Sequence, residues 1–80
     1  MSHVPNELSE LFPDKTALIR DLNGTDAHFA GLTESYHELN RAVHRAETDC
    51  EPTDDAHMTE MRRKRLRLLD EISACIRARA

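Results

Sequence analysis

Residues 26–50 read DAHFAGLTESYHELNRAVHRAETDC, and hydrophobic side chains recur along them at alternating steps of three and four residues. Steps that average 3.5 residues keep one face of an α-helix turned toward a partner helix. The stretch contains no proline, so nothing in it interrupts the backbone hydrogen bonds of a helix. We therefore predict one long helix over about residues 26–50, with a seam of apolar side chains along one face. The seam consists of Phe29, Leu32, Tyr36, Leu39, Val43, Ala46 and Cys50.

A second apolar seam follows Pro52 and predicts another helix over about residues 54–78. Thr53 or Asp54 is its expected N-cap, since both side chains accept hydrogen bonds from free backbone N–H groups. If the chain turns back near Pro52, apolar residues of the two seams meet at every level. The expected fold is therefore all-α, an antiparallel helical hairpin of the coiled-coil type. The second seam comprises Met58, Met61, Leu68, Ile72 and Cys75, and the expected pairs are Val43 with Met61, Tyr36 with Leu68 and Leu32 with Ile72.

The N-terminal part of the chain carries shorter helical signals. Asn6 is the expected cap of a helical piece over residues 7–12. Pro13 ends this piece, because proline disfavours helical geometry in the residue before it. Proline is also favourable at the first position of a helix, so a second piece is expected from Pro13 to about Leu22.

Asn23 and Gly24 form the strongest local breaker in the chain, because glycine adopts left-handed backbone geometry without steric cost. We predict that the helix before them ends here and that Thr25 or Asp26 caps the long helix. The expected organisation is a single domain, in which a kinked N-terminal helical segment (1–24) precedes the helical hairpin (25–80).

The composition and charge of the chain limit the classes of protein to which it can belong. The 80 residues are 32% charged and 39% hydrophobic, which is typical of helical, coiled-coil-like proteins rather than of sandwiches or disordered tails. Residues 1–52 carry a net charge of −6 and residues 53–80 a net charge of +2, so the two halves attract each other when the chain folds back. With no apolar signal region and no stretch of the ~18 apolar residues that a membrane span needs, we expect a soluble, cytoplasmic protein without membrane contact.

The apolar stripe of the second helix is wider than one partner helix covers, because Leu66 and Leu69 flank its seam. Three arrangements would cover the remaining apolar surface of this helix. The N-terminal segment packs on the stripe, a second copy completes a four-helix bundle, or a different protein binds. The expected partners are therefore a homo-oligomer or a helical protein.

Two stretches of the chain resemble a known family. The first is Asp26-Ala27-His28-Phe29-Ala30-Gly31-Leu32, followed by Tyr36, Leu39 and Asn40; the second is Leu66-Arg67-Leu68-Leu69-Asp70-Glu71-Ile72. Together they are similar to the YdcH-like family of small bacterial proteins, over roughly residues 14–77. The resemblance implies a helical hairpin or coiled coil with no established biochemical function. It also implies that the candidate functional positions are Asp26, His28, Phe29, Tyr36, Asp70 and Glu71. The chain departs from the pattern at Leu69, where the family usually has lysine.

Candidate sites are few. Asp26 and His28 fit a recognition site for an anion or a partner, but the sequence favours a structural role, in which Asp26 caps the helix and His28 packs beside the seam or bonds to the chain returning from Gly24. His37 and His44 are seven residues apart, whereas metal-binding pairs on a helix usually lie four apart, so no metal site and no cofactor are expected. No set of residues has the spacing that catalysis needs, and we expect no enzyme.

The run from Arg62 to Arg67 is the sharpest charged feature, and it fits contact with nucleic-acid phosphates. On a helix, however, successive residues turn by ~100°, so the run wraps around the helix. Arg65 then points toward the seam, where its guanidinium group is expected to reach Glu38 or Glu47. The candidate nucleic-acid contacts are Arg62, Arg63, Lys64 and Arg67.

The function that these features favour is a non-enzymatic helical hairpin that self-associates or serves as a protein–protein adaptor. Its expected interaction seam is Phe29, Leu32, Tyr36, Leu39, Val43, Met61, Leu68, Leu69 and Ile72. The alternative is a nucleic-acid-associated protein that uses the basic run, and that alternative predicts binding that weakens steeply with salt.

Overall fold

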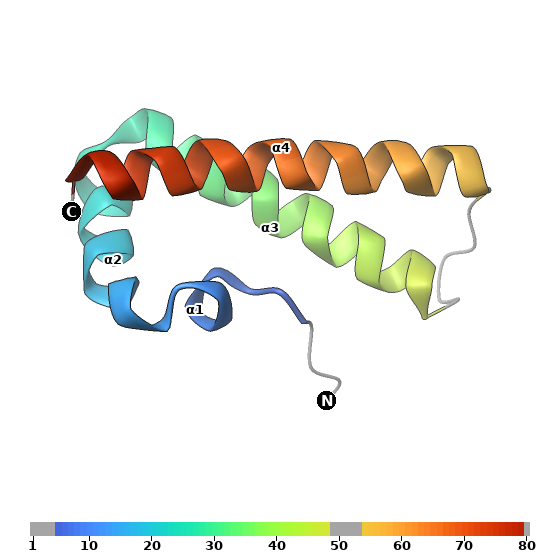
Figure 1. Cartoon of the computed structure of the whole chain (residues 1–80), viewed down its shortest axis with the longest axis horizontal. Helices are drawn as coiled ribbons and strands as arrows, with labels where there is room; N and C mark the ends of the chain where they lie inside the picture. Colours follow the sequence, from blue (N-terminus) through green and yellow to red (C-terminus); the bar gives the residue numbers. More distant parts are fainter. Residues whose placement is uncertain (1–4, 49–53, 80) are drawn as a thin grey trace.

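A computed structural model describes residues 5–48 and 54–79 of the chain. Two long helices, α3 and α4, pack against each other in opposite directions, and two short helical pieces lie beside them (Figure 1). The prediction of an all-α helical hairpin is confirmed. The elements in chain order are α1 (Leu8–Leu11), the 3-10 turn η1 (Pro13–Lys15), α2 (Thr16–Thr25), α3 (Ala27–Glu47) and α4 (Asp55–Arg79).

The hairpin core divides into two clusters whose members match the predicted pairing. In the larger cluster, Phe29, Leu32 and Tyr36 of α3 pack with Ile72 and Ile76 of α4. In the cluster nearer the loop, Val43 and Ala46 pack with Met61. The predicted seam residues that remain partly exposed are Leu39, Met58, Leu68, Leu69 and Cys75, and Cys50 lies outside the described residues.

The N-terminal segment is part of the same core. Leu8 of α1 is 3% exposed and Leu22 of α2 is 1% exposed, and both belong to the cluster that contains Phe29 and Ile72. Figure 1 shows α2 beside the C-terminal end of α4, with α1 following along the hairpin. Of the three coverings left open by the sequence, the N-terminal segment therefore provides at least part.

The predicted helix break exists, but it lies two residues later than the sequence indicated. Helix α2 continues through Asn23 and Gly24 to Thr25, and Gly24 does not adopt left-handed geometry. The backbone N–H of Asp26 donates to Leu22 O (2.8 Å), which keeps this turn helical. The chain then becomes extended at Asp26 (φ −128°, ψ 103°).

Asp26, one of the two predicted candidates, is the N-cap of α3. Its Oδ1 atom accepts from the backbone N–H groups of His28 (3.0 Å) and Phe29 (3.1 Å). Asp54 caps α4 in the same way, because its Oδ1 accepts from the N–H of His57 (2.7 Å). Both long helices thus begin at an aspartate that satisfies free donors and faces the positive helix end.

Two predicted helix ends are wrong. Asn6 does not cap α1: it has left-handed geometry (φ 64°), and Glu7 is the N-cap, with its N–H donating to Glu10 Oε1 (3.3 Å). Helix α3 ends at Glu47, three residues before the predicted end. At that end, the hydroxyl of Thr48 donates back to His44 O (2.9 Å), which competes with continuation of the helix.

Candidate interaction surface

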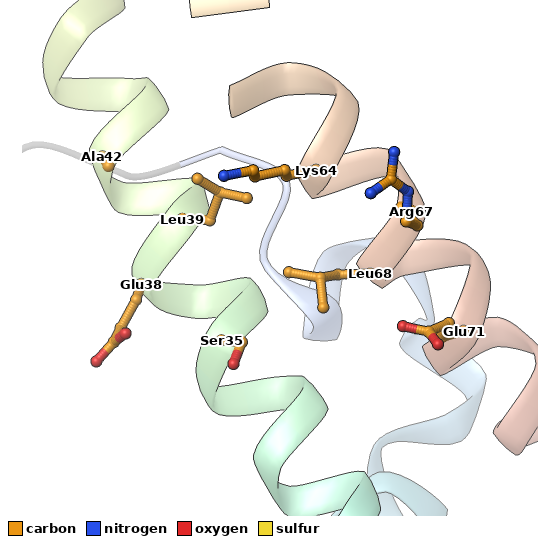
Figure 2. Close-up of a pocket in the computed structure, with 8 residues that line it drawn as sticks. All are labelled: Ser35, Glu38, Leu39, Ala42, Lys64, Arg67, Leu68 and Glu71. Atoms are coloured by element: carbon orange, nitrogen blue, oxygen red, sulfur yellow. The ribbon is translucent and has the colours of Figure 1, made fainter. Parts of the chain in front are cut away.

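A groove of about 510 Å³ runs between α3 and α4. Its floor is apolar: Leu39 and Ala42 come from α3 and Leu68 from α4, and all three are half-buried. Figure 2 shows the Leu39 and Leu68 side chains pointing toward each other between the two helices. These residues belong to the predicted seam, so the groove is the part of the seam that the hairpin leaves open.

The rim of the groove is charged. It is formed by Glu38 of α3 and by Lys64, Arg67 and Glu71 of α4, which are all exposed. Within the described residues, none of these four side chains has an ion pair or a hydrogen bond. The rim therefore offers both signs of charge around an apolar floor, which suits a peptide or helix of mixed charge rather than a small apolar ligand.

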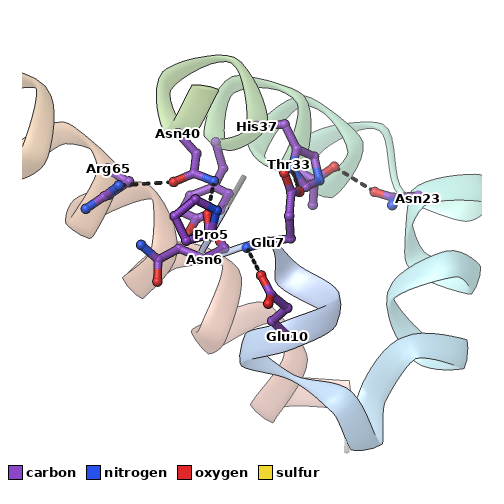
Figure 3. Close-up of polar contacts among 10 residues, drawn as sticks. Pro5, Asn6, Glu7, Glu10, Asn23, Thr33, His37, Asn40 and Arg65 are labelled. Atoms are coloured by element: carbon purple, nitrogen blue, oxygen red, sulfur yellow. Dashed lines mark hydrogen bonds and ion pairs between the residues drawn. The ribbon is translucent and has the colours of Figure 1, made fainter. Parts of the chain in front are cut away.

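Elsewhere on the hairpin, the N-terminal segment is held by hydrogen bonds from α3 (Figure 3). The hydroxyl of Tyr36 donates to Asn6 O (2.7 Å), and the side-chain amide of Asn40 donates to Pro5 O (2.8 Å). Asn40 is 1% exposed and also accepts from Nη1 of Arg65 (3.0 Å). These contacts satisfy the polar groups that the segment buries and so favour its docking in one position.

Two further polar contacts join the N-terminal half to α3. The hydroxyl of Thr33, a buried residue, donates to Asn23 Oδ1 (2.8 Å) across the α2–α3 break. Nδ1 of His37 lies 3.0 Å from Oε2 of Glu7, without the alignment of a hydrogen bond. This contact is therefore an ion pair when His37 is protonated and only a close approach when it is neutral.

The basic run is divided among different surroundings. Arg62 pairs with Glu47 (2.9 Å), and Arg65 turns toward the core as predicted, but its partner is Asn40 and neither Glu38 nor Glu47. Asn40 takes that place because it lies on the buried side of α3, whereas Glu38 is exposed at the rim of the groove. Lys64 and Arg67 line the groove, and Arg63 is exposed.

Of the other predicted positions, Asp26 is half-buried, and His28, Asp70 and Glu71 are exposed. Asp26 serves as a cap, while the side chain of His28 is exposed and so does not pack beside the seam as the simpler interpretation held. Asp70 is exposed, and Glu71 lies at the groove.

A second hollow, of about 320 Å³, lies on the side of α4 near the N-terminal segment. Its lining includes Leu11, which is 39% exposed, Leu66, which is 59% exposed, and the half-buried Leu69.

Sequence reasoning missed the role of Asn40 and Thr33. The signal was present, because Thr33, Tyr36 and Asn40 are spaced by three and four residues and so share one face of α3 with the seam. Three residues with polar tips on one helical face indicate a buried hydrogen-bonding partner, and here the partners are Asn23 and the backbone of Pro5 and Asn6.

Burial raises the pKa of the Tyr36 hydroxyl above its usual value of about 10; the Arg65 guanidinium opposes this shift and the Glu7 carboxylate adds to it. Below pH ~10 the phenol is neutral in both the folded and the unfolded chain. Above it, the unfolded chain loses the proton first, so the free energy of unfolding is expected to fall as the pH rises toward the raised pKa.

Because the chain has one tyrosine and no tryptophan, the ultraviolet absorbance of the phenolate reports Tyr36 alone. The expected result is a titration above pH 10 in the native protein and near pH 10 in urea. A Tyr36→Phe variant should lose the Tyr36 contribution to the alkaline fall in stability. An identical titration in buffer and in urea would contradict the burial of this hydroxyl.

The comparison with family models gives one match, over residues 29–76, to a protein family of unknown function, DUF465. The chain belongs to the DUF465 family. YdcH-like proteins are members of it, so the resemblance found in the sequence is confirmed. The matched residues run from the start of the α3 seam to the last buried residue of α4, which makes the hairpin the part that DUF465 describes. We found no match to this DUF465 protein among curated proteins or solved structures.

Over residues 5–48 and 54–79, no helix is long and apolar enough to cross a membrane. In the same ranges, no three His, Cys, Asp or Glu side chains come together in a group that could hold a metal ion.

Proposed function

We propose that this DUF465 protein is a non-enzymatic interaction protein that binds a helix in the groove between α3 and α4. The observation that carries the proposal is the groove itself, with its apolar floor of Leu39, Ala42 and Leu68 and a rim of charges that have no partner in the part of the chain that the structure describes. An amphipathic helix laid along such a floor buries its apolar face and pairs its flanking charges with the rim. The expected location is the cytoplasm, whose reducing conditions keep a free cysteine such as Cys75 as a thiol.

The hydrogen bonds around Asn40 support this choice of surface. They hold the N-terminal segment against one part of the hairpin, and none of the groove-lining residues takes part in them. The segment and the groove therefore occupy different parts of the surface, and a partner does not need to displace the segment. Self-association and an adaptor role both use the groove in this way.

The test is site-specific photocrosslinking in living bacteria. Ser35, an exposed residue that lines the groove, is replaced by benzoylphenylalanine, and the matched control carries the same group at the exposed Arg20 of α2. Light is expected to give a protein adduct from position 35 and none of the same mass from position 20. Absence of any adduct from position 35, with the chain present at normal levels, would refute a protein-binding groove.

A further inference from the structure

We infer that the second hollow is another binding site, which takes an acidic, apolar segment of another protein. Its lining combines three leucines, Leu11, Leu66 and Leu69, with two arginines, Arg62 and Arg65. The groove and the second hollow have no lining residue in common. Binding at one surface can therefore fail while binding at the other holds.

The two surfaces lie on opposite sides of α4. Leu68 lines the groove and Leu66 lines the second hollow. At about 100° per residue, these two side chains are about half a turn apart around the helix axis. A chain that binds at both surfaces therefore holds two partners at once, one on each side of α4.

The second hollow gathers apolar surface that the fold leaves open to solvent. Among the residues that the structure describes, the exposed large hydrophobic side chains are Leu66 (59%) and Leu11 (39%), and both line this hollow. Exposed apolar surface that is gathered beside polar groups is typical of protein interaction sites. Leu66 belongs to α4 and Leu11 to α1. A small anion would leave these leucines in water, whereas a protein segment laid across both elements covers them.

Arg65 gives the first reason for an acidic partner. It is half-buried, and Nη1 donates to the neutral amide oxygen of Asn40 (3.0 Å, Figure 3). Within residues 5–48 and 54–79, no carboxylate pairs with Arg65. A guanidinium group keeps its charge at all ordinary pH values, and its remaining N–H donors match the two oxygens of a carboxylate. An acidic side chain of the partner supplies the missing negative charge.

Arg62 adds a second positive charge one helical turn before Arg65. It pairs with Glu47, but both side chains of this pair are exposed, so sharing Arg62 with a partner's carboxylate costs little. No aspartate or glutamate of the described residues lines the second hollow, and Glu7 lies against His37 instead (3.0 Å). The lining therefore carries charge of one sign, which attracts acidic groups and repels basic ones.

An anionic bilayer also combines negative charge with apolar groups, but the surroundings of the second hollow disfavour it. The exposed Glu10 and Asp14 lie on either side of Leu11 in the sequence, and the whole chain has a net charge of −4. A bilayer is wide enough to meet these acidic residues as well as the hollow, and it would repel them. A single protein segment meets only the hollow, so a protein is the better partner.

A labelled peptide tests this site on the full chain by fluorescence anisotropy at low ionic strength, where surface charges are least screened. The probe is a helical peptide of about 14 residues, or about four turns, with leucine along one face and glutamate beside it. Saturable binding is expected. The same peptide with lysine in place of glutamate, or with serine in place of leucine, should bind at least about tenfold more weakly, because each lacks one of the two features that the lining recognises.

Four variants that each lower the net charge by one separate the second hollow from the rest of α4. Leu66→Asp should raise the peptide Kd about tenfold, since it removes apolar contact and adds a like charge, and Arg62→Gln should raise it about threefold. Arg63→Gln, at an exposed position that lines neither surface, should leave Kd unchanged, and so should Lys64→Gln in the groove. Circular dichroism of each variant shows that the hairpin is folded.

Equal weakening by Arg62→Gln and Arg63→Gln would overturn the inference, because the peptide would then respond only to overall charge. Sensitivity to Lys64→Gln in place of Arg62→Gln would put the peptide in the groove. Equal binding of the serine peptide, or no binding at millimolar peptide, would also overturn it. So would a chain that ignores the peptide but binds phosphatidylglycerol vesicles through Leu66, since the hollow would then serve a membrane. Peptide binding at the second hollow without an adduct from position 35 keeps this site and removes the groove.

Discussion

Ile72→Asp is expected to abolish the folded state. Ile72 is 0% exposed and lies in the cluster that joins α4 to α3 and to the N-terminal segment. Loss of the side chain costs about 2–5 kcal/mol, and the buried, unpaired carboxylate adds several more. An 80-residue domain has a total free energy of unfolding of about 4–12 kcal/mol, so the variant should be largely unfolded at neutral pH.

The measurement is the helical circular dichroism signal during thermal unfolding. Leu66→Asp is the matched control, because Leu66 is on the same helix and is 59% exposed. It should lower the free energy of unfolding by less than about 1 kcal/mol. A cooperative transition in the Ile72 variant at the wild-type temperature would contradict the position of this side chain in the core.

Leu22→Ala is expected to lower the free energy of unfolding by about 3 kcal/mol. Leu22 is 1% exposed and connects α2 to the cluster that contains Phe29 and Ile76. Its truncation leaves a cavity that the surrounding side chains fill only in part, so the cost exceeds the transfer free energy of the lost atoms. The effect should appear as a lower urea midpoint for the whole chain, since the N-terminal segment and the hairpin share one core.

Leu11→Ala provides the comparison for this prediction. Leu11 also belongs to the N-terminal segment, but it is 39% exposed, and its truncation should cost about 1 kcal/mol or less. Equal losses for the two variants would mean that α2 does not pack on the hairpin. Two separate transitions in the Leu22 variant would mean that the segment and the hairpin unfold independently.

The hairpin was predictable because its signals are periodic and redundant. Each long helix carries a seam that is read from one stretch of sequence, and the two seams agree on one register, as the shared clusters of Val43 with Met61 and of Leu32 with Ile72 confirm.

The N-terminal caps of the two long helices were predictable for a different reason. Asp26 and Asp54 act on backbone N–H groups two or three residues away, so their role needs no tertiary contact.

The helix boundaries that were wrong depend on competing local interactions of similar strength. At Gly24, the backbone stays helical because the hydrogen bonds of the last turn of α2 outweigh the tendency of glycine to end a helix. Asn23 also has a partner, since its Oδ1 accepts a hydrogen bond from Thr33, ten residues later. At Asn6, the backbone takes left-handed geometry, and its carbonyl accepts the Tyr36 hydroxyl from 30 residues away. A local pattern contains no information about such partners.

The candidate surface was predictable only in part. The sequence identified the apolar and charged residues that line the groove, including Leu39, Leu68, Lys64, Arg67 and Glu71. It could not separate the seam residues that the core buries from those that stay open, because this depends on where the N-terminal segment docks. The segment reaches Tyr36 and Asn40 and does not line the groove.

The sequence by itself determined the two long helices, their antiparallel pairing and their N-terminal caps, because periodicity and capping act over a few residues along one chain. The tertiary structure decided which part of the apolar stripe is covered, through Leu8, Leu22 and the hydrogen bonds of Asn40 to distant backbone. It also decided that, among residues 5–48 and 54–79, Arg62 and Arg65 have partners while Lys64 and Arg67 have none. Burial and pairing are properties of residues brought together from far apart in the chain, and so they follow only from the packed structure.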